Sequence, residues 1–245
     1  MFALERKQEI MTILKKENSM TVRKLAATLF VSEASIRRDL TVMEKEGLVK
    51  RVHGGVMLLP GTGEVPLLVR EREEEAAKRR ICEEASKLIR DGNVIFLDAS
   101  STAQFLVRHL ERFDDITVIT NGLKIAEELI ERHIPVYCTG GYVLEKASAM
   151  AGKPAEEMLR QFNADICFIS CKGLSQSGIL SDTSLPETQL RQVMLEQAKQ
   201  SVLLLTGNKL GKTYIHTLCR STDVDYIISD AELPDSIRLR NSESR

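Results

Sequence analysis

The chain has 245 residues, of which 43% are hydrophobic and 28% charged, an ordinary composition for a globular protein that buries a core. The formal net charge of −1 excludes a uniformly basic or acidic protein, and no apolar run approaches the roughly 18 residues that span a bilayer. The first twenty residues contain no signal-peptide core, and five scattered cysteines show no metal-ligand spacing. We therefore expect a cytoplasmic protein with no membrane partner, no metal and no cofactor.

The charge is distributed unevenly along the chain. Residues 1–58 carry 11 Lys and Arg against 7 Asp and Glu, whereas the remainder carries 23 against 28. A basic N-terminal piece attached to an acidic body is typical of a polyanion-binding domain joined to a second domain.

Three short helices are predicted at the N-terminus. Apolar residues recur at helical spacing within residues 3–16 and again from residue 22, where Thr21 is placed to cap the second helix. Ser32 is placed to cap the third helix. On that third helix the apolar positions i, i+4 and i+7 should face the core, and they are Ile36, Leu40 and Met43.

A hairpin follows these helices. The run LVKRVHGGVMLL alternates and is broken by Gly54 and Gly55, which predicts two short strands and a turn. Three helices followed by a hairpin describe a winged helix-turn-helix, whose third helix enters the major groove of DNA while its wing rests on the backbone or minor groove. We assign this domain to residues 1–57.

Two adjacent arginines lie on the third helix, in the stretch VSEASIRRDL. An isolated Arg-Arg pair is more often a solvated face, but on a recognition helix the guanidinium fork suits guanine edges and phosphate oxygens. The predicted DNA-binding residues are Ser32, Ser35, Arg37, Arg38 and Thr41 on the helix, with Lys50, Arg51 and His53 on the wing. The expected partner is a double-stranded DNA operator.

Residues 6–56 closely resemble the N-terminal signature of the DeoR family of bacterial transcriptional regulators. The segments VSEASIRRDL and KRVHGGV, at this spacing, carry the resemblance. It implies a DNA-binding regulator, and repression rather than activation is implied by the family and not by any residue.

A domain boundary is predicted after the wing. LLPGTGEVPLL holds two prolines and two glycines, so we assign a linker to residues 58–69, a second domain to 70–235 and a polar tail to 236–245. The second domain begins with the charged helix REREEEAAKRRICEEASKLI, whose apolar seam is Ala77, Ile81, Ala85 and Leu88. Its charges form either a solvated face, the default, or a contact between subunits.

From residue 93 onward, short β-branched runs alternate with helical stretches. This alternation predicts a mostly parallel sheet with helices on both faces, an α/β architecture. The predicted strands are residues 94–99, 117–120, 136–140, 166–171, 201–206 and 225–230. No GxGxxG follows the first strand, so the dinucleotide fingerprint is absent.

The loops after these strands supply hydroxyls, amides and lysines but little bulk. Ligands of such sheets bind beyond the carboxyl ends of the strands, where hydroxyls and free backbone N–H groups favour an anion, so a phosphate with the hydroxyls of a sugar suits this lining. Ser, Thr, Asn and Gly also cap helices and form turns in any α/β protein, so each loop alone is more often structural.

The resemblance extends to residues 70–230, which look like the family's C-terminal sensor domain, similar in fold to ribose-5-phosphate isomerase. By resemblance the phosphosugar site maps to Asp98, Ser101, Thr102, Thr120, Asn121, Gly140, Gly141 and Lys209. Ser100 stands where the family has a loop glycine. If that position requires a positive φ, serine is strained or the loop differs; its hydroxyl also adds a group within reach of a phosphate.

Two functions from different classes are open. The first is a transcriptional regulator, a repressor of a carbohydrate operon, whose DNA affinity is changed by a phosphorylated sugar. The second is a phosphosugar isomerase or deaminase with an accessory domain, for which Asp98, Glu187 and Lys209 are the candidate acid and base groups. The attached DNA-reading domain favours the regulator, with no enzymatic activity. Because one recognition helix makes few base contacts, we also expect a homo-oligomer, at least a dimer.

Overall fold

The structure, a computed structural model, describes residues 3–17, 19–45, 48–52, 54–58 and 67–237. Contacts within the chain divide it into two compact units, residues 1–69 and 70–245. Most of the segment expected to be a linker falls outside the described residues, as does nearly all of the expected polar tail. No helix in the described part is both long and apolar enough to cross a bilayer.

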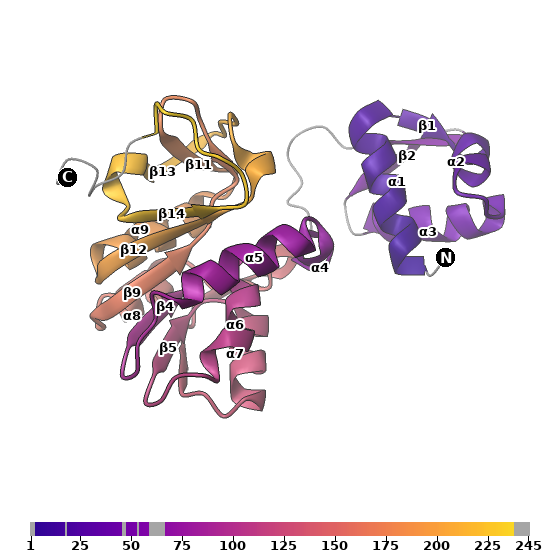
Figure 1. The fold of residues 1–245 in the computed structure, drawn as a ribbon. Coiled ribbons are helices and arrows are strands. Elements are labelled where there is room, and N and C mark those ends of the chain that lie inside the picture. Colours follow the sequence, from indigo (N-terminus) through magenta and orange to yellow (C-terminus); the bar gives the residue numbers. More distant parts are fainter. Residues whose placement is uncertain (1–2, 18, 46–47, 53, 59–66, 238–245) are drawn as a thin grey trace. The chain divides into compact units, whose positions relative to one another are not determined.

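The N-terminal unit consists of three helices and a small antiparallel sheet (Figure 1). The helices are α1 (Ala3–Glu17), α2 (Val22–Thr28) and α3 (Glu33–Lys45), and the strands are β1 (Ser19–Thr21), β2 (Val49–Val52) and β3 (Gly55–Leu58). The sheet order is β1-β3-β2. The three expected helices and the hairpin are confirmed, whereas the three-residue strand β1, which pairs with β3, was missed.

The expected caps and core of this unit are also confirmed. Thr21 Oγ1 accepts a hydrogen bond from Lys24 N at 3.2 Å, and Ser32 Oγ accepts one from Ser35 N at 3.2 Å. These bonds satisfy backbone donors that a helix start leaves unpaired. Ile36, Leu40 and Met43 of α3 are buried together with apolar residues of α1, α2, β2 and β3.

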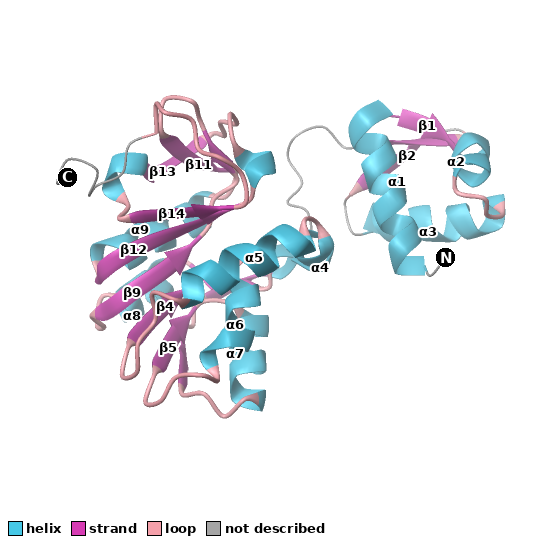
Figure 2. Ribbon diagram, viewed as in Figure 1, coloured by secondary structure: helices cyan, strands magenta, loops and turns pink. Residues whose placement is uncertain are grey.

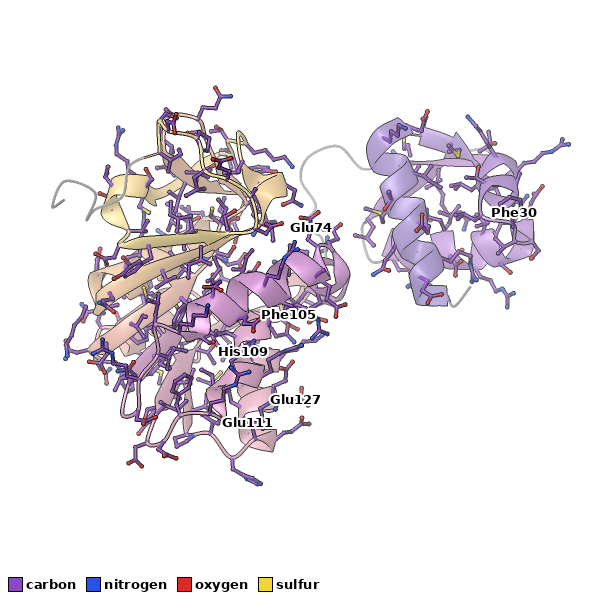
Figure 3. All side chains as sticks on the ribbon, in the orientation of Figure 1. Phe30, Glu74, Phe105, His109, Glu111 and Glu127 are labelled. Carbon is purple, nitrogen blue, oxygen red and sulfur yellow. The ribbon has the colours of Figure 1, made fainter. Side chains whose placement is uncertain are left out.

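The turn between α2 and α3 is a Schellman motif. Val31 N donates to Ala26 O at 3.0 Å and Phe30 N to Ala27 O at 3.4 Å, which satisfies the last carbonyls of α2. Phe30 occupies the position after the cap with φ of 53°, a left-handed conformation that costs a non-glycine residue roughly 1–2 kcal/mol. Val31 packs against the core, whereas the Phe30 side chain points away from it (Figure 3).

The second unit is built on a six-stranded parallel sheet with the order β14-β12-β9-β4-β5-β6. Its strands are β4 (Val94–Leu97), β5 (Thr117–Thr120), β6 (Val136–Cys138), β9 (Ala164–Ile169), β12 (Ala198–Leu205) and β14 (Tyr226–Ser229). All neighbouring pairs are parallel. Each of the six predicted strands is therefore present, and the predicted α/β class is confirmed.

Helices cover both faces of this sheet (Figure 2). Ile95 and Leu97 of β4 pack with α5 (Glu75–Ser86), 3₁₀ helix η1 (Ala103–Leu106), α6 (Val107–Leu110) and α7 (Leu123–Glu131), whereas Phe96 faces α8 (Lys153–Leu159) and α9 (Leu185–Glu196). This alternation follows from the two-residue period of a strand. It creates two apolar layers and leaves the strand ends free for polar groups.

Two smaller sheets were not predicted. One has the order β10-β11-β13, from β10 (Gly173–Leu174), β11 (Ile179–Asp182) and β13 (His216–Arg220), and the other pairs β7 (Tyr142–Leu144) with β8 (Ala149–Ala151). Three further 3₁₀ helices lie in connections, at η2 (Glu145–Ala147), η3 (Gly207–Lys209) and η4 (Ser221–Asp223). The charged helix expected over residues 70–89 is also interrupted, because Glu74 takes a left-handed φ of 57° between α4 (Leu67–Arg72) and α5.

Candidate functional site

The outward face of α3 carries the two adjacent arginines. Arg37 and Arg38 are both exposed, and Arg37 Nη2 donates to Glu33 Oε2 at 2.9 Å, one helical turn earlier. A pair this exposed contributes little to stability, so phosphate or a base edge can replace it without a large loss. Both guanidinium groups are therefore available to a ligand outside the domain.

Thr41 joins the third helix to the wing. Its hydroxyl donates to Arg37 O at 2.8 Å and accepts from Arg51 Nη1 at 2.8 Å, while Arg51 N donates to Glu44 Oε1 at 2.7 Å. These contacts fix the wing strand β2 against α3. Lys50 is exposed on the same strand, and His53 lies outside the described residues.

The serines at the start of α3 have a capping role. Ser32 and Ser35 hydroxyls lie 3.0 Å apart, and the Ser32 side chain is exposed. Their hydroxyls sit at the positive end of the helix dipole, where a phosphate oxygen is stabilised. The predicted DNA-binding residues that the structure describes thus lie along α3 and β2.

A buried ion pair anchors α3 to α1 and was missed from the sequence. Arg6 Nη2 donates to Asp39 Oδ1 at 3.2 Å, and Arg6 Nε donates to Asp39 Oδ2. The hydrogen bond and the charge of Asp39 raise the pKa of Arg6, although burial opposes this. Asp39 follows the arginine pair in sequence but faces inward, so it positions the recognition helix.

In the second unit, Asp98 lies at the carboxyl end of β4 and is only 1% exposed. Its Oδ1 accepts from Ser100 N at 3.1 Å, and its Oδ2 accepts from Ser170 N at 3.1 Å and from Arg191 Nε at 2.6 Å. Both oxygens are therefore engaged inside the protein, and the carboxylate organises two strand-end loops.

Arg191 of α9 is the centre of a buried charge cluster. It is 5% exposed and pairs with three carboxylates, since Nη1 donates to Asp182 at 2.9 Å and Nη2 to Glu187 at 3.3 Å in addition to the bond with Asp98. Burial disfavours its charge, but the three carboxylates outweigh that cost and raise the pKa of Arg191. The guanidinium ties β4, β11 and α9 together.

Two lysines approach the same loops. Lys209 Nζ donates to Ser170 Oγ at 2.8 Å, and Lys78 Nζ donates to Ser101 Oγ at 3.1 Å and to the carbonyl of Arg70. Burial lowers the pKa of Lys209; burial, followed by the charge of Lys209, lowers the pKa of Lys78 to about 8. The charge of Lys209 thus disfavours the ammonium form of Lys78, and an anion bound beside Lys78 would favour it.

Ser100 adopts no positive φ, so the serine in place of the glycine carries no left-handed strain. Its Oγ accepts from Ala103 N at 3.1 Å, at the start of η1. The hydroxyl of Thr102 in the same loop is buried and has no hydrogen-bond partner among the described residues. The loop therefore takes a shape that suits serine and leaves one polar group unsatisfied.

Thr120 and Asn121 lock neighbouring loops together. Thr120 Oγ1 accepts from Gly122 N at 3.0 Å; Asn121 Oδ1 accepts from Ala99 N at 3.0 Å, and Asn121 Nδ2 donates to Met150 O at 3.0 Å. Their side chains are buried and engaged. Asn121 holds the loop after β4 beside β8, and Thr120 fixes the turn that follows β5, so both have a structural role near the predicted site.

The glycine pair after β6 has left-handed backbone, with φ of 66° at Gly140 and 104° at Gly141. A Cβ on Gly141 would lie 2.3 Å from Ala151 O, whereas one on Gly140 would meet nothing within 4 Å. Gly141 is thus required by a close backbone approach, and Gly140 borders open space.

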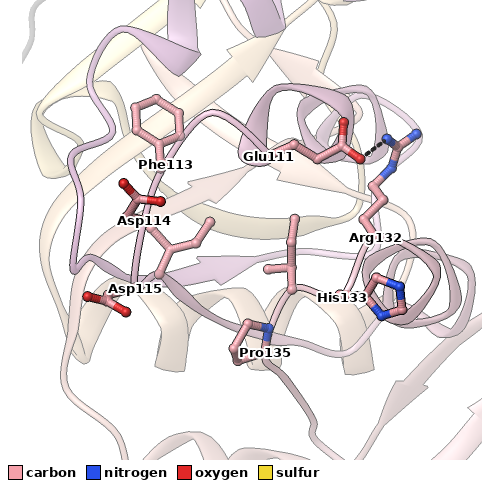
Figure 4. Close-up of a pocket in the computed structure, with 9 residues that line it drawn as sticks. Glu111, Phe113, Asp114, Asp115, Arg132, His133 and Pro135 are labelled. Atoms are coloured by element: carbon pink, nitrogen blue, oxygen red, sulfur yellow. Dashed lines mark ion pairs between the residues drawn. The ribbon is translucent and has the colours of Figure 1, made fainter.

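A hollow of about 290 Å³ opens at the opposite, amino-terminal ends of the strands, beside the residues that precede β5 and β6 (Figure 4). It is lined by Glu111, Phe113, Asp114, Asp115, Ile116, Arg132, His133, Ile134 and Pro135. Arg132 is paired with Glu111 at 2.8 Å, which leaves His133 and two aspartates as the other ionisable groups in the lining. Two carboxylates disfavour a phosphate, so the carboxyl ends of the strands, where Lys78 and Lys209 lie, are the better anion site.

Lys78, Ser170, Asp182 and Arg191 were missed from the sequence. Lys78 lies within a charged run that reads as solvated, but its side chain is 4% exposed. The sequence position of two of these residues could have revealed them. Lys78 borders the apolar seam of α5, and Arg191 lies between the buried Leu190 and Val193 of α9. A charge on the buried stripe of a helix needs an internal partner.

Comparison with protein families agrees with this two-part architecture. The DeoR-like helix-turn-helix domain matches residues 6–60, and the DeoR C-terminal sensor domain matches residues 73–231. The chain belongs to the DeoR family of transcriptional regulators. The resemblance found in the sequence is confirmed, and the chain is a DNA-binding transcriptional regulator.

Similar proteins of this family align along nearly the whole chain. HTH-type transcriptional regulator GolR of Listeria innocua is 34% identical over 238 residues, which cover 95% of this chain and 92% of GolR. HTH-type transcriptional repressor GlcR of Bacillus subtilis is 30% identical, covering 94% and 89%. The lactose phosphotransferase system repressor of Staphylococcus epidermidis is 27% identical, covering 92% and 91%.

Solved structures show a likeness in fold. eIF2B delta from Chaetomium thermophilum superposes with a TM-score of 0.51 at 15% identity, covering 66% of this chain and 58% of that chain. Ribose 5-phosphate isomerase A from Methanocaldococcus jannaschii gives a TM-score of 0.43 at 21% identity, covering 56% and 55%. Identities this low concern the fold and not the ligand.

Proposed function

We propose that this DeoR-family regulator represses a carbohydrate-metabolism operon and that a phosphorylated sugar bound to the second unit changes its affinity for operator DNA. The observation that carries the proposal is the pair of lysines, Lys78 and Lys209, that meet hydroxyl-bearing loops at the carboxyl edge of the sheet. The names of two similar proteins, a lactose phosphotransferase system repressor and a transcriptional repressor, support repression and a sugar-linked operon.

The effector site is proposed to hold a phosphate between the two ammonium groups. Each hydrogen bond between a charged group and the phosphate contributes about 1.5–3 kcal/mol, and the anion also relieves the repulsion between the lysines. Ser100, Ser101, Thr102, Gly140 and the backbone near Lys209 border the sugar. Asp98, Thr120, Asn121 and Gly141 hold these loops in place rather than contact the ligand, because their polar groups or backbone are already engaged.

The DNA site is proposed to consist of α3 and the wing. Arg37 and Arg38 reach bases and phosphates, Ser32 and Ser35 offer the helix start to a phosphate, and Thr41, Lys50, Arg51 and His53 complete the surface. One such surface makes few base contacts at about 1–3 kcal/mol each, so we propose at least a dimer that reads repeated half-sites. The protein acts in the bacterial cytoplasm and is associated with the nucleoid when bound to DNA.

An isomerase or deaminase is the competing function, and the site favours binding without turnover. Catalysis on a sugar phosphate needs a carboxylate free to accept a carbon-bound proton. Asp98 and Glu187 are both buried and ion-paired with Arg191, through Oδ2 of Asp98 and Oε1 of Glu187, and this pairing favours their charged, structural form. The similar proteins are also named as regulators.

A thermal-shift series tests the effector site. Wild-type protein is heated with a panel of sugar phosphates, the matching unphosphorylated sugars and inorganic phosphate, because a ligand that binds only the folded state raises Tm. We expect one or a few sugar phosphates to raise Tm more than phosphate alone. Lys78→Met and Lys209→Ala should lose this shift, and Lys87→Ala, an exposed lysine at the end of α5, should keep it.

Two outcomes would contradict the proposal. If the unphosphorylated sugars stabilise the protein as well as the phosphorylated ones, the lysines do not bind a phosphate. If the panel member that binds is converted to product at enzymatic rates, followed by NMR, the competing enzyme function is correct.

A further inference from the structure

Phe30, at the turn between α2 and α3, is an aromatic residue placed fully in solvent. It is 94% exposed, whereas Phe96 and Phe168 are completely buried and Phe105 is nearly so. Phe113 and Phe162 are partly buried against the two cores of the second unit. A ring this exposed makes little contact within the domain, so its whole apolar surface is available to a partner outside it.

The backbone conformation at this position disfavours phenylalanine. Phe30 takes the left-handed position of a Schellman motif, with φ of 53°. Glycine and asparagine are favoured there because a Cβ clashes in that conformation. Conformational strain retained at an exposed position, with no compensating internal contact, is typical of a residue that works in binding.

The position of the turn points to the partner. Phe30 precedes Ser32, the cap of α3, by two residues, and the N-terminal residues of a recognition helix are those that reach base edges. Around the ring, the exposed residues Thr28 and Ser32 are polar, Ala27 is small and Val31 is half-buried, so Phe30 is the one large exposed apolar side chain among residues 27–32. Stable interfaces between protein copies have a core of several buried apolar residues, whereas this turn offers one large ring.

We propose that Phe30 is a DNA-contacting residue whose ring packs on the apolar surface of the duplex beside α3. Apolar carbon on DNA comes from two sources, the C5 methyl of thymine in the major groove and the deoxyribose of the backbone. The proposal rests on the proposed function, in which α3 reads DNA, and adds a hydrophobic contact to the charged ones of Arg37 and Arg38.

The test uses the full chain and duplexes that the wild-type protein selects from a random pool. Phe30→Asn removes the ring and suits the left-handed backbone, whereas Phe30→Leu keeps an apolar side chain. We expect Phe30→Asn to bind about tenfold more weakly at fixed salt with no fall in Tm, and Phe30→Leu to retain most of the affinity. The dependence of affinity on salt should be the same for all three proteins, because the ring neutralises no phosphate.

Replacing thymine by deoxyuridine in the selected duplex separates the two sources. If the ring contacts thymine methyl groups, wild-type protein loses affinity on the deoxyuridine duplex and Phe30→Asn, which lacks the ring, does not. If it contacts deoxyribose, the two proteins keep the same ratio of affinities on both duplexes. These outcomes distinguish the two sources once Phe30→Asn has shown its loss of affinity on the selected duplex.

Three results overturn the inference. The first is that Phe30→Asn binds within about twofold of wild type, and the second is that Phe30→Leu loses as much affinity as Phe30→Asn. The third is a change in the oligomeric state of Phe30→Asn in size-exclusion chromatography, which would assign the ring to a contact between copies. A wild-type protein that selects no duplex contradicts the proposed function itself, which is a different failure.

Discussion

The two units of the chain place their candidate residues in opposite environments. In the N-terminal unit, Arg37, Arg38 and Lys50 are exposed and contribute little to the fold. In the second unit, Asp98, Lys78 and Arg191 are buried and bonded to one another or to strand-end loops. A surface that reads a large polyanion needs only charges on a rigid scaffold, whereas a site for a small anion has to exclude water and hold its cations in place.

This difference predicts how the two units respond to substitution. On the DNA-reading face, binding and stability should separate, because exposed ion pairs contribute about 0–1 kcal/mol. At the carboxyl ends of the parallel strands, binding and stability should be coupled, because the groups that would bind the effector are supported by groups that also hold the fold.

The largest effect is expected from Arg191→Met. This substitution leaves three buried carboxylates without their cation and should lower the free energy of unfolding of the second unit by about 3–5 kcal/mol, measured by urea denaturation. The control is Arg160→Met, since Arg160 pairs with Glu196 on the surface and its loss should cost less than about 1 kcal/mol. Equal effects of the two substitutions would remove the contrast between buried and exposed charge.

Arg38→Ala should affect binding alone. Loss of a base or phosphate contact at this exposed position should weaken binding to a selected duplex by about 1–3 kcal/mol, or roughly 5–150-fold, with the unfolding free energy unchanged. A fall of about one in the slope of log affinity against log salt would assign the contact to a phosphate. Unchanged affinity would exclude Arg38 from the interface.

The effector affinity should depend on pH through Lys78, whose pKa is lowered to about 8 by burial and by Lys209. A bound phosphate favours the ammonium and raises that pKa, so binding takes up a proton above pH 8. Affinity should be fully present well below pH 8, about halve near pH 8 and fall up to about tenfold by pH 9, measured by calorimetry. Lys78→Met should flatten this fall; a profile that stays the same in Lys78→Met assigns the titration to another group.

A smaller effect is expected at the start of α3. Ser32→Ala removes the cap of the recognition helix and should lower the unfolding free energy of the N-terminal unit by about 1 kcal/mol, measured by thermal denaturation. DNA affinity should fall as well if the Ser32 hydroxyl also meets a phosphate. Thr21→Ala, which removes the cap of α2, is the matched control, with a similar loss of stability and intact DNA affinity.

Most of the fold could be predicted because its signals are local. Apolar runs of strand length alternating with amphipathic helices predicted all six strands of the parallel sheet, and Ile36, Leu40 and Met43 predicted the buried face of α3. The two small antiparallel sheets could not be predicted, because β7, β8 and β10 have only two or three residues and are defined by their partners across the chain.

The candidate site was predicted less completely than the fold. The loops that follow the strands were found because parallel strands bring their carboxyl ends to one edge. Which of these residues contact one another could not be predicted, because the partners are far apart in the sequence. Arg191 bonds to Asp98, 93 positions away, and Lys78 bonds to Ser101, 23 positions away. The environment of Phe30 was equally hidden, because an apolar residue beside a helix is expected in the core and only the structure shows its side chain exposed.

The central claim is that an anion at the strand edge changes how tightly the N-terminal unit holds DNA. The most direct measurement is the Kd for a selected duplex with and without the sugar phosphate that raises Tm, for wild type and Lys209→Ala at the same effector concentration. We expect a change of roughly 5–150-fold for wild type and little change for Lys209→Ala, whose affinity for DNA without effector should be normal. An identical Kd for wild type with and without the effector would contradict it.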